Sequence, residues 1–124
     1  MSDNELAEPL RRPVLAKADA SPAPTPPVVT FDRQELRDIL NLYGRKVAEG
    51  EWRDYAIDFN RERATFSIFR RAAETPLYRI EKDPKLARRQ GAFSVVNGMG
   101  LVLRRGHELA RVLGVLDKGR LKVV

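Results

Sequence analysis

Large apolar side chains alternate with smaller or polar ones over most of residues 53–82, and this alternation constrains the fold more than any other feature. It is seen in three runs, at 55–59, 64–69 and 78–81. A period of two residues is typical of a β-strand that buries one face. Aromatic and β-branched residues, which favour strands, occupy most of the apolar positions. The stretch therefore predicts three strands that fold back on one another in an antiparallel meander.

The alternation also predicts the register of these strands. A two-residue turn at residues 61–62 sets the following pairs opposite each other on one face: Tyr55 and Ile68, Ile57 and Phe66, Phe59 and Ala64. A connection through residues 72–76 then sets Ile68 opposite Ile80. A slip by one residue would expose the whole apolar set. We therefore expect every large residue of the stretch except Phe69 and Leu77 to face one core beneath two helices.

A helix is predicted before the strands, from Asp32 to Glu49. Asp32 is a good N-cap, and Glu35 stands three residues later, as a capping box requires. Phe31 and Leu36 are placed as a hydrophobic staple, and Gly50 supplies the stop. The face predicted to meet the core carries these apolar residues at helical spacing: Leu36, Ile39, Leu40, Tyr43 and Val47.

The rest of the chain predicts a hairpin and a second helix. After Asp83 and Pro84, a basic connection at 85–90 closes at Gly91, and strands follow at 92–96 and 101–104 around the turn signal Asn97-Gly98. A helix from His107 to Lys118 is predicted to bury Leu109, Val112, Leu113 and Leu116. A single helix over 101–117 is the alternative, which Gly106 disfavours, and 121–124 could add a short strand.

These elements predict an α+β fold, a two-layer sandwich. Its antiparallel sheet of about five strands combines a three-stranded meander with a hairpin, and an N-terminal and a C-terminal helix cover it. Residues 28–124 form this single domain in our interpretation. Residues 1–27 hold six of the eight prolines and none of the nine aromatic residues, so we expect a disordered Pro/Ala-rich tail.

Composition excludes several classes of protein and site. The chain has no cysteine and one histidine, His107, which excludes disulfide scaffolds, thiolate zinc sites and histidine-cluster metal sites. Its glycines form no phosphate loop, so no cofactor is expected. The acidic start lacks the apolar segment of a signal peptide, and no stretch is long enough to span a membrane. We therefore expect a cytoplasmic protein.

The candidate site is a basic cluster. Residues 28–124 have a formal charge of +7 and the tail −1. If the basic residues of the turns and strand ends converge, they form a surface for an anionic ligand, with Phe69 able to stack on a base. An alternative is that Arg79 makes only a cation–π contact with Phe69. The candidate residues are Arg63, Phe69, Arg70, Arg71, Arg79, Lys85, Arg88, Arg89, Arg104 and Arg105.

Five segments of the chain carry a family resemblance. They read WRDYAIDF at 52–59, ATFSIFRR at 64–71, PLYRIEKDP at 76–84, GAFSVVN at 91–97 and RRGHEL at 104–109. Together they resemble domain of unknown function 2794, an uncharacterised family of small proteins found mostly in alpha-proteobacteria. The likeness spans about residues 28–118. It implies a bacterial cytoplasmic setting and no known activity, so it transfers no functional residue.

Three functions are compatible with these features. The first is a non-enzymatic accessory or regulatory module that binds a nucleic acid or an acidic protein through the arginine-rich surface. Its binding would be salt-sensitive and weakened by charge reversal at Arg70, Arg71, Arg88 and Arg89. The second is a protein-interaction adaptor that uses a sheet edge or the tail. The third is a small enzyme that uses His107 with an aspartate. The sequence favours the first two and does not separate them.

Overall fold

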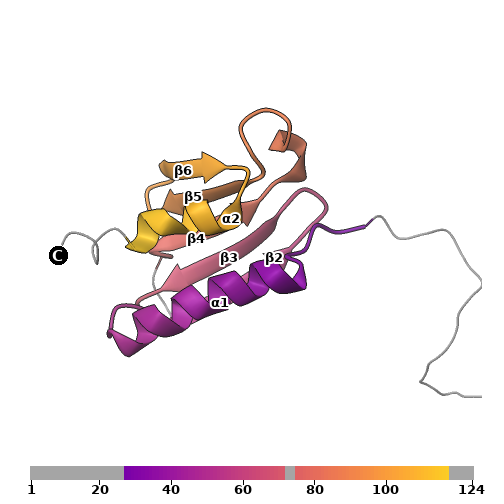
Figure 1. Cartoon of the computed structure of the whole chain (residues 1–124). Helices are drawn as coiled ribbons and strands as arrows, with labels where there is room; N and C mark the ends of the chain where they lie inside the picture. Colours follow the sequence, from indigo (N-terminus) through magenta and orange to yellow (C-terminus); the bar gives the residue numbers. More distant parts are fainter. Residues whose placement is uncertain (1–26, 72–74, 118–124) are drawn as a thin grey trace, which may run out of the picture.

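The computed structural model describes residues 27–71 and 75–117 and contains one antiparallel sheet with two helices over one of its faces (Figure 1). The sheet order is β2-β3-β4-β5-β6. The elements are α1 (Arg33–Ala48), β2 (Asp54–Phe59), β3 (Ala64–Phe69), β4 (Tyr78–Lys82), the 3-10 turn η1 (Pro84–Leu86), β5 (Phe93–Asn97), β6 (Val102–Gly106), α2 (Leu109–Leu113) and the 3-10 turn η2 (Gly114–Asp117). The α+β fold predicted from the sequence is confirmed. Nearly all of the proposed tail, and the proposed strand at 121–124, lie outside the described residues.

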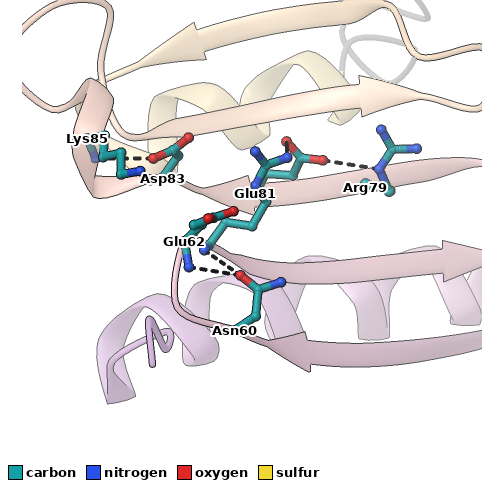
Figure 2. Close-up of polar contacts among 7 residues, drawn as sticks. Asn60, Glu62, Arg79, Glu81, Asp83 and Lys85 are labelled. Atoms are coloured by element: carbon teal, nitrogen blue, oxygen red, sulfur yellow. Dashed lines mark hydrogen bonds and ion pairs between the residues drawn. The ribbon is translucent and has the colours of Figure 1, made fainter. Parts of the chain in front are cut away.

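The predicted pairing of β2 with β3 is confirmed residue by residue. Tyr55 lies opposite Ile68, Ile57 opposite Phe66 and Phe59 opposite Ala64. The turn closes without the usual Asn-Gly because the Asn60 side chain accepts hydrogen bonds from the N–H groups of Glu62 (2.9 Å) and Arg63 (3.0 Å), as Figure 2 shows.

The predicted pairing of β3 with β4 is wrong by two residues. Ile80 lies opposite Phe66, and Ile68 lies opposite Tyr78 rather than Ile80. The faces are still correct, because a shift of two residues keeps every side chain on its own side of the sheet. The alternation of apolar residues specifies the face of each strand but not this offset.

The core lies between the sheet and the two helices. Its fully buried side chains include Phe66, Ile68, Ile80 and Val95 of the sheet, Ile39 of α1 and Val112 of α2. The predicted face of α1 needs correction. Leu40 and Val47 are exposed, whereas Leu42 and Lys46 are buried. The apolar stripe of α1 is wider than the face that meets the sheet, so its far side projects past the edge strand β2.

Strand β2 is less buried than the sequence predicts. Tyr55, Ile57 and Phe59 lie on the helix face of the sheet but remain 42%, 38% and 38% exposed. The reason is the position of β2 at one end of the sheet order. The expectation that these three side chains are buried beneath the helices is therefore wrong, although Tyr55 does stack on Phe66 with ring centroids 4.8 Å apart.

The N-terminus of α1 is capped as predicted and is also tied to the sheet. Asp32 and Glu35 form the capping box. The Glu35 carboxylate accepts hydrogen bonds from the Asp32 N–H (2.8 Å) and from the Lys82 amine (2.8 Å). Lys82 also donates to the Thr30 carbonyl at 2.9 Å. One carboxylate thus stabilises the helix start and attaches it to the end of β4.

The last part of the described chain differs from prediction in its element boundaries. β6 continues to Gly106, and α2 covers only Leu109–Leu113 before the chain tightens into η2. The predicted extent of the last helix is therefore wrong, and the alternative of one helix over 101–117 is also wrong. Gly114 caps α2, because its N–H bonds back to the preceding turn. Burial of Leu109, Val112, Leu113 and Leu116 is confirmed. No helix in the described ranges is long and apolar enough to cross a membrane.

Candidate anion-binding site

A hollow of about 470 Å³ lies where β6 leads into α2. Its size is within the range of small-ligand pockets. We call it the basic hollow. It is lined by Arg104, Arg105, Gly106, His107, Glu108, Arg111 and Val112. The lining includes three arginines and one glutamate, so its formal charge is positive. Arg104 and Arg105 are consecutive in β6, opposite Val95 and Ser94, so their side chains leave opposite faces of the strand. The end of the strand, the connecting residues and the first turns of α2 all contribute to it.

Close backbone packing produces the sharp passage from β6 to α2. A Cβ atom on Gly106 would lie 3.2 Å from the Cγ2 atom of Val112. A Cβ atom on Gly91, whose φ is +102°, would lie 2.1 Å from the carbonyl carbon of Gly106. The loop that ends at Gly91 therefore packs directly against the end of β6. This contact fixes where the strand stops and hence where the arginines of the basic hollow stand.

The arginines of the hollow are partly engaged with neighbouring groups. The Arg104 guanidinium donates to the Arg111 carbonyl at 3.1 Å. Arg111 pairs with Glu108 at 3.0 Å, and these two side chains are 84% and 68% exposed. An ion pair that exposed contributes little to stability and exchanges readily with solvent. Guanidinium groups bind phosphate and carboxylate oxygens in a planar fork, so the hollow can accept an anion.

His107 lies in the same hollow beside Glu108. The enzyme hypothesis required a carboxylate near His107, and the lining supplies Glu108 rather than the expected aspartate. That carboxylate is paired with Arg111. Asp54 and Asp58 are at the opposite edge of the sheet, on β2. Within residues 27–71 and 75–117, no group of three or more metal-binding side chains is close enough to hold an ion.

Two of the candidate arginines lie on the helix-free face of the sheet and contact an acidic residue. Arg79 donates to the Glu81 carboxylate at 3.1 Å, and Arg63 approaches it to 3.9 Å. Figure 2 shows Arg79 and Glu81 side by side along β4. Glu81 is only 15% exposed. It offsets one of the two positive charges, so this part of the candidate cluster offers a reduced net charge to a ligand.

Six of the other candidates lie in two groups, one at each end of the sheet. Phe69, Arg70 and Arg71 are at the end of β3, with Phe69 half-buried opposite Asp54. Lys85, Arg88 and Arg89 are exposed around η1, after the end of β4. Because β3 and β4 are antiparallel, these two groups lie at opposite ends of the sheet, roughly 17 Å apart along the strands. Of the ten candidates, only Arg104 and Arg105 lie in the basic hollow.

A family comparison supports the resemblance seen in the sequence. The model of a family described as protein of unknown function, DUF2794, matches residues 29–113. The chain belongs to the DUF2794 family. The match starts just before α1 and ends with α2, so it includes the whole sheet and every residue of the basic hollow. Searches of curated proteins and of solved structures found no match.

Sequence reasoning on this DUF2794 member missed Arg111 and the role of the β6–α2 junction. It placed the end of the strand at residue 104, two residues early, and began the helix at His107. The one signal available was the sequence Arg-Arg-Gly-His-Glu at 104–108, in which a glycine separates two basic residues from the next helix. Without the position of Gly91 against Gly106, that signal does not indicate a hollow.

Proposed function

We propose that this DUF2794 protein is a non-enzymatic accessory or regulatory module that binds the phosphate groups of a nucleic acid through the basic hollow. The observation that supports it is a concave surface of about 470 Å³ whose lining includes three arginines and one glutamate. Phosphate oxygens suit the fork of a guanidinium group. The proposal keeps the cytoplasmic location expected from the sequence.

A nucleic acid is favoured over an isolated anion by the distribution of the remaining charge. Arg70 and Arg71 are exposed at one end of the sheet, and Arg88 and Arg89 are exposed at the other. A duplex carries a phosphate charge about every 1.7 Å along its axis. It can therefore reach an outlying basic pair while one phosphate occupies the hollow. An acidic protein is the alternative partner, and the experiment separates the two.

The test is fluorescence anisotropy with a labelled DNA duplex, a labelled RNA strand and a labelled polyglutamate peptide, each at low and moderate salt. We expect the nucleic acids to bind more tightly than the peptide. We also expect log K to fall with log salt, with a slope of about −2 to −3 if three arginines contact phosphates. Equal affinity at both salt concentrations, or preference for polyglutamate, would contradict the proposal.

Matched variants locate the contact. Arg104→Gln with Arg111→Gln removes two positive charges from the hollow, and Arg88→Gln with Arg89→Gln removes two from the η1 region. Both double variants have the same net charge, so the long-range attraction falls equally. A charge-assisted hydrogen bond is worth about tenfold or more in affinity. We therefore expect the hollow variant to bind at least tenfold more weakly than the η1 variant. Equal losses would show that the hollow is not the site.

A further inference from the structure

Strand β2 has β3 on one side and no strand on the other in the described part of the chain. The segment before α1 reaches only the end of β2, where the Val29 N–H donates to the Asn60 carbonyl at 2.8 Å. The Asn60 N–H donates to the Arg63 carbonyl at 3.0 Å, which makes this a hydrogen-bonded pair. Such pairs alternate along an antiparallel ladder. The peptide groups that point to the open edge are therefore those of Tyr55, Ile57 and Phe59. The Tyr55 N–H is bonded to the neighbouring Asp54 carboxylate at 2.9 Å, which a change of one side-chain rotamer releases.

The same three residues present apolar side chains that are already held in place. Tyr55 stacks on Phe66 with centroids 4.8 Å apart and meets Tyr43 edge-on at 5.0 Å. Phe59 meets Phe31 edge-on at 6.1 Å. Despite these contacts, Tyr55 and Phe59 remain 42% and 38% exposed. Side chains that are fixed on one side and open on the other lose little conformational entropy when a partner binds.

Helix α1 extends this apolar surface. Tyr43 contacts Tyr55, so the side of α1 that carries Tyr43 faces the β2 edge. Leu40 and Val47 flank Tyr43 on that side of the helix, three and four residues away, and are 37% and 41% exposed. We call the combined surface the β2–α1 apolar edge. It consists of Leu40, Tyr43, Val47, Tyr55, Ile57 and Phe59.

The opposite edge of the sheet is protected in a way that β2 is not. The pairing of β5 with β6 contains a register shift at Val95 and Val96, and β6 carries Arg104 and Arg105. Irregular pairing hinders the addition of a further strand. Charge does not distinguish the two edges, because β2 also carries two charged residues, Asp54 and Asp58. The pairing of β2 with β3 is regular over six residue pairs. Of the two edges, β2 is the one prepared to accept a strand.

We propose that the β2–α1 apolar edge binds a second copy of this chain, with the two β2 strands antiparallel about a twofold axis at Ile57. A twofold axis perpendicular to the sheet keeps all helices on one face. Residues that lie opposite each other across the two β2 strands must then point to the same face of the sheet. This requires one residue of β2 to lie opposite its own copy at the axis.

Ala56 and Ile57 are the central residues of β2, and charge selects which of the two faces its own copy at the axis. With the axis at Ile57, this residue faces its own copy, Tyr55 faces Phe59, and Asp58 faces Ala56. With the axis at Ala56, Asp54 would face Asp58 twice, and directly opposed like charges are destabilising. The axis at Ile57 also makes Ile57 a hydrogen-bonded pair with its copy, because its peptide groups point to the open edge. A self-complementary strand of this kind fits a second copy of itself.

The exposed area indicates a weak dimer. Exposed fractions of 37–42% on five large side chains correspond to roughly 300–400 Å² of apolar surface per copy. A standard interface buries about 800 Å² per partner, so this one is at the low end even with its backbone hydrogen bonds. We therefore expect a concentration-dependent dimer with a dissociation constant of about 1–100 µM.

The first test is sedimentation velocity of the full chain from about 1 to 500 µM, a range that brackets the expected dissociation constant. Ile57→Lys places two ammonium groups opposite each other on the axis and should raise the dissociation constant at least tenfold. The matched control is Val102→Lys on β6, because Val102 and Ile57 are similarly exposed, at 40% and 38%. Circular dichroism confirms that both variants are folded. A monomer at every concentration, or dissociation by Val102→Lys instead, would overturn the proposal.

The second test is disulfide cross-linking, which remains decisive if Ile57→Lys does not fold. The chain has no cysteine, so a single introduced thiol can pair only with its copy. Ile57→Cys places two Cα atoms about 5.5 Å apart across the axis, within disulfide range. Ala56→Cys is the control, since residue 56 faces Asp58 in this register. Rapid cross-linking at 57 and slow cross-linking at 56 are expected, and the reverse result would overturn the proposal.

Discussion

Replacing Gly91 by alanine tests the contact that terminates β6 and shapes the basic hollow. A Cβ atom at this position would lie 2.1, 2.2 and 2.6 Å from three backbone atoms of Gly106. Carbon atoms approach each other to about 3.5 Å at best, so the two segments must separate by roughly 1.5 Å. The residues next to this contact, Phe93 and Gly106, are the last pair between β5 and β6, and that pairing cannot survive such a displacement.

The expected loss of stability has two parts. The backbone strain comes from φ, which is +102° at Gly91 and costs about 1–2 kcal/mol once a Cβ is present. The steric clash also breaks the hydrogen bonding at the end of the β5–β6 pairing and loosens the packing around Val112. These effects lower the free energy of unfolding by about 2–3 kcal/mol more. Gly100→Ala is the matched control, because Gly100 has φ +88° and nothing within 4 Å of its Cβ position. Only the strain of about 1–2 kcal/mol applies there.

Urea unfolding and thermal melts followed by circular dichroism measure both variants. A loss of 1 kcal/mol lowers the melting temperature of a domain of this size by about 4–8 °C. We therefore expect a decrease of about 4–16 °C for Gly100→Ala and at least about 12 °C for Gly91→Ala, with the larger decrease always at Gly91. If Gly91→Ala is as stable as Gly100→Ala, the loop does not pack against β6 as described, and the account of how the hollow forms is wrong.

Three further predictions concern α1 and its contacts. Burial, and then the charge of Asp54, raises the pKa of Tyr43 above its ordinary value of 10.0. Stability should therefore be complete below about pH 10 and decrease as the pH rises through the folded-state pKa. Melts of Tyr43→Phe should show a smaller alkaline loss. Lys82→Met removes two hydrogen bonds, one of them to the Glu35 carboxylate at 2.8 Å, and should cost about 2 kcal/mol in urea unfolding. A variant as stable as the parent would show that this tie is not formed. Lys46 is 4% exposed, and its amine pairs with Glu49 at 3.5 Å and with Glu51 at 3.7 Å. Lys46→Met should change stability by less than about 1 kcal/mol, because both carboxylates remain in contact with solvent and an apolar chain of similar size avoids the desolvation of the amine. A loss of 3 kcal/mol or more in the same assay would contradict this.

The predictable part of the fold is the part specified by local interactions. Asp32 and Glu35 make their capping box within one turn of helix, and Asn60 closes the β2–β3 turn with its own side chain. The β3–β4 offset is different, because the connection through 72–76 can change by two residues without moving any side chain to the other face. The alternation alone could not show whether Ile68 lies opposite Tyr78 or opposite Ile80.

Burial could not be read from the pattern for β2, for a related reason. The spacing of Tyr55, Ile57 and Phe59 predicts a shared face, and they do share one. How much of that face is covered depends on which strand ends the sheet and where α1 lies, and neither is encoded in the spacing. The misassigned residues of α1, Leu40 and Val47, are exposed on the same side. The errors in β2 and α1 thus have one cause, an apolar surface that a single copy of the described chain does not cover.

The sequence predicted which types of residue the candidate site contains, but it did not predict how they are arranged in space. Nine basic residues were proposed from their charge, together with Phe69, but contacts between residues on different elements determine which of them act together. Glu81 of β4 pairs with Arg63 of the β2–β3 turn as well as with Arg79 of its own strand. The antiparallel order sends Arg70 and Arg88 to opposite ends. Arg111 joins Arg104 only because the chain turns at Gly106. Arginine content alone indicates that an anion can bind, whereas the position of two glycines decides where.

The two proposals make a joint prediction that neither makes alone. The sheet order places β2 and β6 at opposite edges, so pairing of two β2 strands leaves both basic hollows at the far ends of one sheet. Nine strand spacings of about 4.8 Å separate them by roughly 43 Å. A duplex rises about 3.4 Å per base pair, so about 13 base pairs are needed to reach both hollows. Above that length, binding becomes bivalent, and affinity should increase by tenfold or more. Anisotropy with duplexes of increasing length should show this step for the parent chain and a gradual change for Ile57→Lys. A step that persists in Ile57→Lys would mean that the two hollows are not joined through β2.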